Sequence, residues 1–332
     1  MTLGEEMLKV IKTTTVAATL LLTLSAQADQ FEPLQIQARS IVGPLPEVMP
    51  GSENDTPALI ALGEKLFMDT RLSINDTQSC NSCHNVTNSG TGVDNTELSP
   101  GAVYGRFGSR NAPTVWNAGL QFAQFWDGRE PDLKAQAKGP ILNHVEMGMP
   151  SAEAVIKKLS AVPEYQQSFK AAFNSTEAMN YDNLAHAIAA FERTLITKDR
   201  FDLYMKGNKN ALNQQEKDGL QAFINTGCIA CHRGSTLGGN MFQKLGVVNP
   251  YENQSDQGRF ELTKNPQDKM HMKVPMLRDV ARTAPYFHDG QVKTLEEAVT
   301  KMASLQLGRD LDEKTVADIV AFLKSMNHDD SL

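Results

Sequence analysis

Apolar residues recur at helical spacing in several separate stretches of the chain, and no long run alternates strictly between apolar and polar positions. Thr56-Pro57 combines an N-cap with a proline suited to the first helical turn, which predicts a helix that runs to about Met68. The apolar spacing predicts further amphipathic helices at 151–161, 182–195 and 315–326.

Two capping patterns mark the starts of other helices. Asn213-Gln-Gln-Glu216 resembles a capping box, and Thr294-Leu-Glu-Glu297 has its full form and opens a helix to about Ala303. The stretches 85–109 and 233–271 lack periodicity and predict long loops, whereas 29–55 is polar and rich in proline and predicts an arm or loop.

Residues 1–28 predict a secretory signal peptide that is cleaved after Ala28. Two lysines precede an apolar run over 16–24, and Ala26-Gln27-Ala28 has the small-residue pattern of a cleavage site. The run is too short for a membrane span, which needs about 20 apolar residues. The alternative is a buried N-terminal helix. An exported chain without another long apolar stretch is expected in the periplasm or outside the cell.

Composition excludes several classes of protein. The chain has 332 residues, of which 41% are hydrophobic and 21% charged, as in ordinary globular domains. This excludes disordered, collagenous and multi-span membrane chains. The formal net charge of −7 argues against a nucleic-acid partner.

The four cysteines form two C-x-x-C-H motifs, Cys80-Asn-Ser-Cys83-His84 and Cys228-Ile-Ala-Cys231-His232. This spacing is typical of covalent haem c attachment, in which two thiols add to the haem vinyl groups and the adjacent histidine reaches the iron. The alternatives are a disulfide within each pair, a four-cysteine zinc site and a thioredoxin-like redox pair. The zinc site would not need the histidines, and no βαβ context supports the redox pair.

A faint internal repeat precedes the two motifs. Gly63-Glu-Lys-Leu-Phe67 is similar to Gly219-Leu-Gln-Ala-Phe223, which indicates two related units in one chain. The predicted fold is mainly α, with two cytochrome c-like haem domains, long loops and little β structure. The predicted divisions are a signal peptide at 1–28, an arm at 29–56, a first haem domain at 57–200 completed by part of the C-terminal segment, and a second haem domain at 201–332.

The second axial ligand decides what each haem does, because a methionine ligand suits electron transfer and an open position suits ligand activation. Five other histidines and fourteen methionines are candidates. The histidines are His144, His186, His271, His288 and His328. Spacing alone does not choose among them.

From about residue 57 to 325 the sequence resembles the bacterial di-haem cytochrome c peroxidases and the related MauG-like proteins. The resemblance rests on specific stretches: Ser79–Asn85, Arg110-Asn-Ala-Pro-Thr-Val-Trp-Asn117, Gln124-Phe-Trp-Asp-Gly-Arg129, Gln136-Ala-Lys-Gly-Pro140, Val145-Glu-Met147, Thr283-Ala-Pro-Tyr-Phe-His-Asp-Gly290, Leu295-Glu-Glu-Ala-Val299 and Met302 with Gln306-Leu-Gly308.

The resemblance implies a role for each haem. The haem at His84 would be the peroxidatic, low-potential one, and the haem at His232 the electron-entry, high-potential one with Met302 as second ligand. Trp126 would lie between the haems as an electron bridge. On the residues alone, Trp126 is better explained as a packed core aromatic.

The resemblance also implies a peroxide pocket and a calcium site. Glu146 and Gln136 would line the pocket, where a carboxylate can accept and return a proton and an amide can only orient peroxide. Asn111, Thr283 and Pro285 match positions that hold calcium, the last two through backbone oxygens. On the residues alone, Glu146 could be a solvated loop carboxylate and Asn111 a turn-former.

One departure from the family affects activation. Many members carry a histidine in the loop after the first motif, and this histidine blocks the peroxidatic iron until the other haem is reduced. Ala102 stands at the matching position, and no histidine lies between 85 and 143. Tyr104 and His144 are the nearest substitutes.

The leading hypothesis is a periplasmic peroxidase that reduces hydrogen peroxide to water with two electrons from a small c-type cytochrome or cupredoxin. The resemblance is also compatible with a homodimer. The alternatives are a MauG-like enzyme that oxidises a partner protein and a di-haem electron carrier without catalysis. MauG-like proteins have tyrosine at the position of Met302, so Met302 favours the peroxidase.

Overall fold

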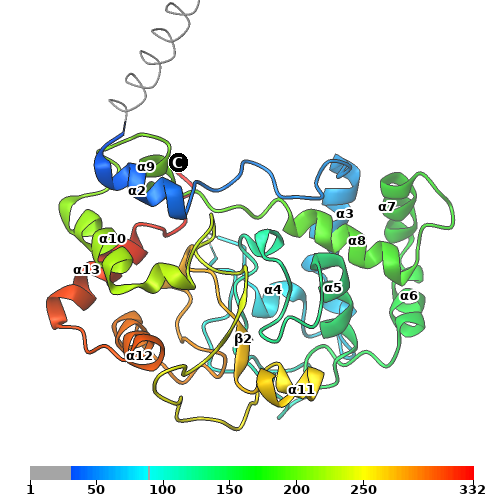
Figure 1. Cartoon of the computed structure of the whole chain (residues 1–332). Coiled ribbons are helices and arrows are strands. Elements are labelled where there is room, and N and C mark those ends of the chain that lie inside the picture. The colour runs from blue at the N-terminus through cyan, green and yellow to red at the C-terminus, as the bar shows by residue number, and fades with distance from the viewer. Residues whose placement is uncertain (1–30, 89) are drawn as a thin grey trace, which may run out of the picture.

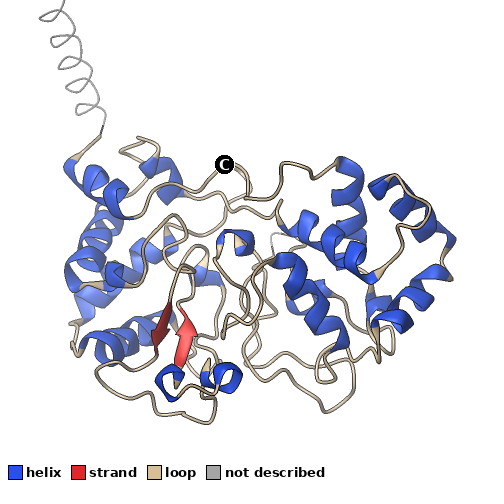
Figure 2. Cartoon of the chain, turned by 45° about the vertical axis from the view of Figure 1, so that its right-hand side comes forward, coloured by secondary structure: helices blue, strands red, loops and turns tan. Residues whose placement is uncertain are grey.

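The computed structural model describes residues 31–88 and 90–332, so the predicted signal peptide at 1–28 lies outside the described residues. The chain is mainly helical, as predicted, and its helices form two groups (Figure 1). Long loops run between the groups (Figure 2). The one named sheet of the described residues pairs β1 (Phe242–Lys244) and β2 (His271–Lys273) antiparallel, with Phe242 opposite Lys273.

The α-helices in chain order are α2 (Pro33–Ile41), α3 (Pro57–Phe67), α4 (Cys80–Cys83), α5 (Leu133–Leu142), α6 (Ala152–Ser160), α7 (Pro163–Phe173), α8 (Tyr181–Glu192), α9 (Arg200–Met205), α10 (Gln214–Thr226), α11 (Phe260–Thr263), α12 (Leu295–Leu307) and α13 (Glu313–Lys324). Short 3₁₀ turns are η1 (Thr70–Leu72), η2 (Ala118–Leu120), η3 (Cys228–Ala230), η4 (Pro266–Asp268) and η5 (Val280–Arg282).

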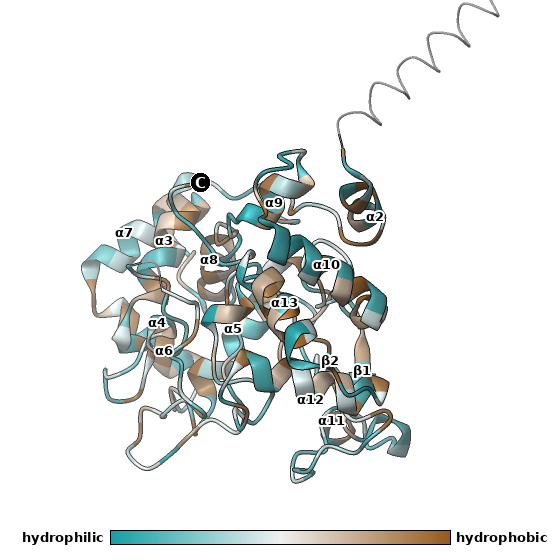
Figure 3. Cartoon of the chain, turned by 90° about the vertical axis from the view of Figure 1, so that its left-hand side faces the viewer, coloured by the Kyte–Doolittle hydropathy of each residue, from teal (hydrophilic) through white to brown (hydrophobic). Residues whose placement is uncertain are grey.

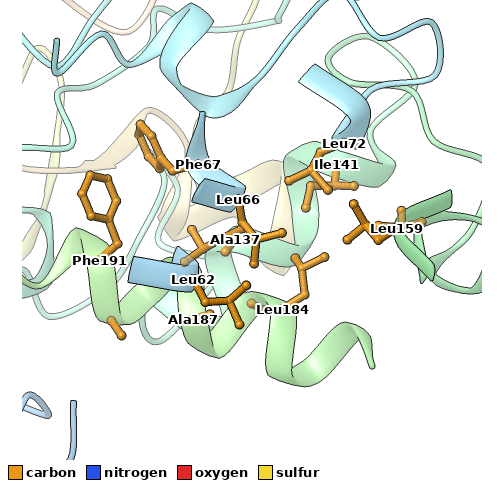
Figure 4. Packing of buried hydrophobic residues seen from close by; sticks show 14 of the residues in the cluster. Leu62, Leu66, Phe67, Leu72, Ala137, Ile141, Leu159, Leu184, Ala187 and Phe191 are labelled. Atoms are coloured by element: carbon orange, nitrogen blue, oxygen red, sulfur yellow. The ribbon is translucent and has the colours of Figure 1, made fainter. Parts of the chain in front are cut away.

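The first hydrophobic core forms where α3 crosses α8. Leu62, Leu66 and Phe67 of α3 pack against Ala187 and Phe191 of α8 (Figure 4). At the crossing the two backbones approach so closely that a Cβ on the α3 glycine, residue 63, would lie 1.9 Å from a carbonyl oxygen of α8. A glycine is therefore required at this position.

The second core repeats this arrangement with α10 and α13. Leu220 and Phe223 of α10 pack against Ile319 and Phe322 of α13. A Cβ on Gly219 would lie 1.8 Å from the backbone oxygen of Asp318 in α13. The glycine that recurs in the two sequence repeats thus has the same packing role in both, which supports the predicted internal repeat.

The capping predictions are largely met. Thr56 caps α3 by accepting from the Leu59 N–H at 3.2 Å. Asn213 and Glu216 form the reciprocal capping box of α10, with bonds of 3.0 and 2.8 Å. At α12, Thr294 accepts from the Glu297 N–H at 3.1 Å, but the Glu297 carboxylate accepts from the Lys293 N–H, so only half of that box forms. This helix also continues to Leu307, beyond the predicted end.

The segment predicted as an arm or loop at 29–55 contains the helix α2, which corrects that prediction. Pro33 occupies the first turn of α2, where its missing N–H costs nothing, so this proline starts a helix instead of preventing one. The Gln35 amide donates to the backbone oxygen of Tyr204 at 2.7 Å, and Ala38 and Val42 enter the second core. The arm is therefore anchored on the second group of helices.

Several further helices were not predicted, among them α5 and α7, and the stretch predicted as a long loop at 233–271 contains β1 and the short helix α11. In α5 the pair Gly139-Pro140 indicates a loop, yet the helix continues through both residues to Leu142. In α7 the polar sequence hides a buried pair, Tyr165 and Phe169, which joins the first core. In both cases tertiary packing outweighs a weak local signal.

The described helices have mixed polar and apolar faces, as the hydropathy colours of Figure 3 show. None of them combines the length and the apolar character that crossing a bilayer requires.

We expect Gly219→Ala to lower the free energy of unfolding by about 1–3 kcal/mol or more, because overpacking at a helix crossing displaces both helices. Gly139→Ala is the matched control. It also lies in a helix, but its Cβ would meet only the Phe125 ring at 3.5 Å, an ordinary contact. Thermal or denaturant unfolding of the haem-loaded proteins measures both. Equal stability of the two variants would contradict the crossing.

Candidate functional site

The first C-x-x-C-H motif forms one short helix, α4, with His84 at its end. Ser79 caps α4, and the His84 Nδ1 lies 3.3 Å from the Gly92 backbone oxygen. A carbonyl partner on Nδ1 leaves Nε2 as the ring nitrogen for a metal, which is the usual arrangement of a histidine ligand. Burial lowers the pKa of His84 and favours the neutral imidazole that an iron needs.

The second motif repeats this arrangement without a full helix. Cys228 and Cys231 lie in and just after η3, behind the left-handed Gly227 that ends α10. The His232 Nδ1 lies 3.0 Å from the Leu237 backbone oxygen. Both histidines are therefore oriented in the same way by a backbone carbonyl downstream of their motif.

The cysteine chemistry agrees with haem attachment. No disulfide joins any two of the four cysteines. Within the described part of the chain, no three His, Cys, Asp or Glu side chains gather as a metal site, and so the two cysteine pairs do not meet as a four-thiolate zinc cluster.

Each motif lines its own cavity. Cys80, Cys83 and His84 line the first cavity, and Cys228, Cys231 and His232 line the second. Eight residues line both cavities and form what we call the shared wall: Asn111, Ala112, Pro113, Thr114, Gln121, Phe125, Trp126 and Lys273.

Trp126 lies in the shared wall, as the resemblance implies. Its indole N–H donates to the Asn111 backbone oxygen at 2.9 Å, and its own backbone oxygen accepts from the Lys273 N–H at 2.7 Å. The preceding Phe125 has a φ of 66°, so the turn that presents Trp126 is held in a conformation that L-residues rarely adopt. Hydrogen bonds to the backbone of Asn111 and of the distant Lys273 thus hold this aromatic residue between the cavities.

Glu146 and Gln136 both line the first cavity, so the structure brings these two predicted residues together. The Asn143 amide donates to the Glu146 Oε1 at 2.9 Å. Burial raises the pKa of Glu146 above its usual range, although the charge of Arg129 and the bond from Asn143 oppose this. A carboxyl with a raised pKa is better matched to proton transfer near neutral pH.

Met302 lies on α12 and lines the second cavity together with His232. Met272 and Met276 line the same cavity and are buried. The cavity therefore offers three thioethers, and its lining alone does not choose among them.

Asn111, Thr283 and Pro285 also meet at the second cavity. The Asn111 side-chain amide donates to the backbone oxygens of Thr96 and Glu97 at 2.9 and 3.3 Å. Its N–H groups are thereby engaged, which leaves the amide oxygen as the end available to a cation.

The loop at the position of the family's blocking histidine is fixed against the rim of the first cavity. Ala102 is buried, its N–H donates to the Glu146 backbone oxygen at 2.7 Å, and its own oxygen accepts from the Asn75 amide at 2.6 Å. Tyr104 and His144 are both exposed and line neither cavity, so the two substitutes suggested for the missing histidine are wrong for this conformation.

The other histidines differ in their surroundings. His186, His271 and His328 line neither cavity. His288 lines the second cavity, is 1% exposed, and has an Nε2 without a hydrogen-bond partner among the described residues. Its ring centroid lies 6.3 Å from that of Trp126.

Sequence reasoning missed two buried charged residues at the cavities. Glu192, at the end of α8, lines the first cavity, and burial raises its pKa to about 8. Lys273 lies in the shared wall and is 4% exposed. The available signals were a charged residue that directly follows the apolar run Ala187–Phe191 on a helix, and a single lysine between the apolar Met272 and Val274 at the end of a strand.

Comparison with known proteins agrees with this geometry. Residues 57–210 match the family model described as "Di-haem cytochrome c peroxidase", and residues 216–327 match the one described as "Cytochrome c". The two matches meet between the two cysteine motifs, so that each contains one motif.

Two curated relatives are similar over nearly the whole chain. The cytochrome c551 peroxidase of Pseudomonas aeruginosa is 44% identical, covering 93% of this chain and 90% of the relative. The protein of the same name from Nitrosomonas europaea is 43% identical with the same coverage. Among solved structures, a MauG-like protein associated with microbial copper homeostasis superposes with a TM-score of 0.73 at 26% identity, covering 86% of this chain and 92% of that one.

Proposed function

Because the chain belongs to the di-haem cytochrome c peroxidase family, we propose that it works in the periplasm and takes two electrons per peroxide from a small c-type cytochrome or cupredoxin. Membership makes it an oxidoreductase that acts on hydrogen peroxide and carries two covalently bound haem c groups. The observation that carries the proposal is the pair of C-x-x-C-H cavities that meet at one shared wall.

The periplasmic location is supported by the signal-peptide pattern at 1–28, with its lysines, apolar run and Ala26-Gln27-Ala28. A small donor protein is the natural electron source there, since the second cavity needs only an electron and no substrate of its own.

The first cavity is proposed as the peroxide site. Bound haem would supply the electrons for cleavage of the O–O bond. Glu146 can take a proton from one oxygen of hydrogen peroxide and return it to the other, which becomes the leaving water. Gln136 can hold peroxide through its amide but cannot move the proton. Arg129, at the rim, would favour the ionised form of Glu146 that starts the cycle.

The second cavity is proposed as the electron-entry site, with His232 and Met302 as the two iron ligands. A methionine ligand raises the potential of a haem c, which suits a group that receives electrons and passes them on. Trp126 lies in the wall between this cavity and the first, and we propose it as the bridge. Met302 also favours the peroxidase over the MauG-like alternative.

We further propose a calcium ion held by the Asn111 side-chain oxygen and the backbone oxygens of Thr283 and Pro285. These oxygens are the type that a hard cation prefers, and the three residues share one cavity lining. Calcium takes six to eight oxygens, so water would supply the remainder.

The proposed function is tested by steady-state oxidation of a reduced small c-type cytochrome after addition of hydrogen peroxide. The wild-type protein should turn over, and Glu146→Gln should keep both haems yet lose about 10²–10⁴-fold in rate, the usual contribution of a general acid–base group. Because burial raises the Glu146 pKa, the wild-type rate should fall with decreasing pH already above the ordinary glutamate range. The glutamine variant should lack that pH limb.

The matched control is Glu153→Gln, an exposed carboxylate in the first turn of α6. It should turn over like the wild type. If Glu146→Gln also stays within about a factor of two, Glu146 is not the proton shuttle, because that change is far below the range for general acid–base catalysis.

We expect Met302→Leu to leave both haems attached and to lower or disrupt the higher of the two reduction potentials, because the thioether ligand is lost. Met276→Leu removes a buried thioether from the same cavity and should leave both potentials unchanged. A redox titration followed by absorbance measures both variants. Unchanged potentials in Met302→Leu would remove this residue from the ligand set.

Because two hydrogen bonds hold Ala102 in place, we expect that no side chain of this loop binds the haem iron in the first cavity. Of the histidines in the described residues, His84 alone lines the first cavity, and Met147, the methionine on its lining, is packed into the first core. Electron paramagnetic resonance of the fully oxidised protein should therefore show a high-spin ferric signal beside the low-spin His232/Met302 haem. A spectrum that is entirely low-spin would mean that another ligand closes the site.

A further inference from the structure

Lys273 is a buried cation with no ion-pair partner among the described residues, although the charge of the buried Asp127 reaches it at longer range. Its side chain is 4% exposed, and its ammonium donates to the Gln121 side-chain oxygen. Among the described residues no carboxylate oxygen lies within 4 Å of it, whereas the other fully buried cation, Arg278, pairs with Asp199 at 2.9 Å and Asp202 at 3.1 Å. An ammonium has three protons to donate, so a single amide oxygen leaves most of this capacity unused.

The position of Lys273 is fixed by backbone. It ends β2, lies opposite Phe242 of β1, and its N–H donates to the Trp126 backbone oxygen at 2.7 Å. Lys273 and Gln121 both belong to the lining of both cavities. Lys273 therefore lies between the two spaces that the haems would fill.

Burying an unpaired ammonium costs several kcal/mol, and proteins seldom do so without a partner. Burial lowers the pKa of Lys273 to about 7, although the charge of Asp127 opposes this. An anion in either cavity next to Lys273 would offset the free-energy cost of burying its ammonium. Haem c carries two propionate carboxylates, which are anions of the right kind in the right space.

We propose that Lys273, held by Gln121, is the ammonium partner of a haem propionate at the shared wall and raises the reduction potential of that haem. A positive charge beside a haem favours the reduced state, which carries one more electron. The proposal rests on the haem occupancy of the proposed function but not on its peroxide chemistry. Redox potentials therefore test it even in a protein that does not turn over peroxide.

The experiment is a spectroelectrochemical titration of the haem-loaded protein. Lys273→Met should lower the midpoint potential of one haem by at least about 59 mV, which corresponds to a tenfold change in its one-electron equilibrium constant. Lys273→Arg, which keeps the charge, should stay close to the wild type. The midpoint potential that changes, the higher or the lower one, identifies the haem whose propionate pairs with Lys273.

The matched control is Lys244→Met, which removes the same charge from an exposed position on the neighbouring strand. It should leave both midpoints unchanged. Unchanged midpoints in Lys273→Met, or an equal shift in Lys244→Met, would overturn the proposal. Should Lys273→Met fail to load haem, a crystal structure of the wild-type holoprotein decides: a propionate oxygen within 4 Å of the Lys273 Nζ supports the pair, and its absence refutes it.

Discussion

The hydrogen bonds of Trp126 join the chain segments that form the shared wall, and the two cavities depend on this wall. The indole N–H donates to the Asn111 backbone oxygen, and the Trp126 carbonyl accepts from the Lys273 N–H, so the shared wall joins two neighbouring segments to a third that is far away in sequence. Each of these segments lines both cavities. A displacement of any one of these segments would change the lining of both cavities at once. The loops around the shared wall are held in place by backbone hydrogen bonds.

On each side of the shared wall, two helices cross closely at a glycine. A glycine lets α3 approach α8, and another lets α10 approach α13, in each case just before a C-x-x-C-H motif. The two halves differ in what they add. The first adds Gln136 and Glu146 around its cavity, and the second adds thioethers such as Met302. The same helix arrangement thus occurs twice, with different side chains around each cavity. The different roles proposed for the two haems follow from these side chains.

Short-range chemistry was readable from the sequence, and long-range packing was not. The haem motifs, the capping of α3 and α10 and the glycine repeat depend on residues close together in the chain, and all were predicted. The sequence does not predict helix α2 because a proline such as Pro33 also suits a loop. It does not predict the burial of Lys273, because that depends on Gln121 and Trp126, which are more than a hundred residues away. The absence of a loop histidine was visible in the sequence, but the bonds that fix Ala102 were not.

The central claim is that peroxide reacts in a first cavity that no loop ligand closes. Stopped-flow absorbance tests it most directly, with the fully oxidised and the half-reduced protein each mixed with hydrogen peroxide in the presence of reduced cytochrome c. The account predicts that both forms react at once and that oxidation of the cytochrome begins without a lag. A fully oxidised protein that stays inert, and reacts only after half-reduction, would contradict it.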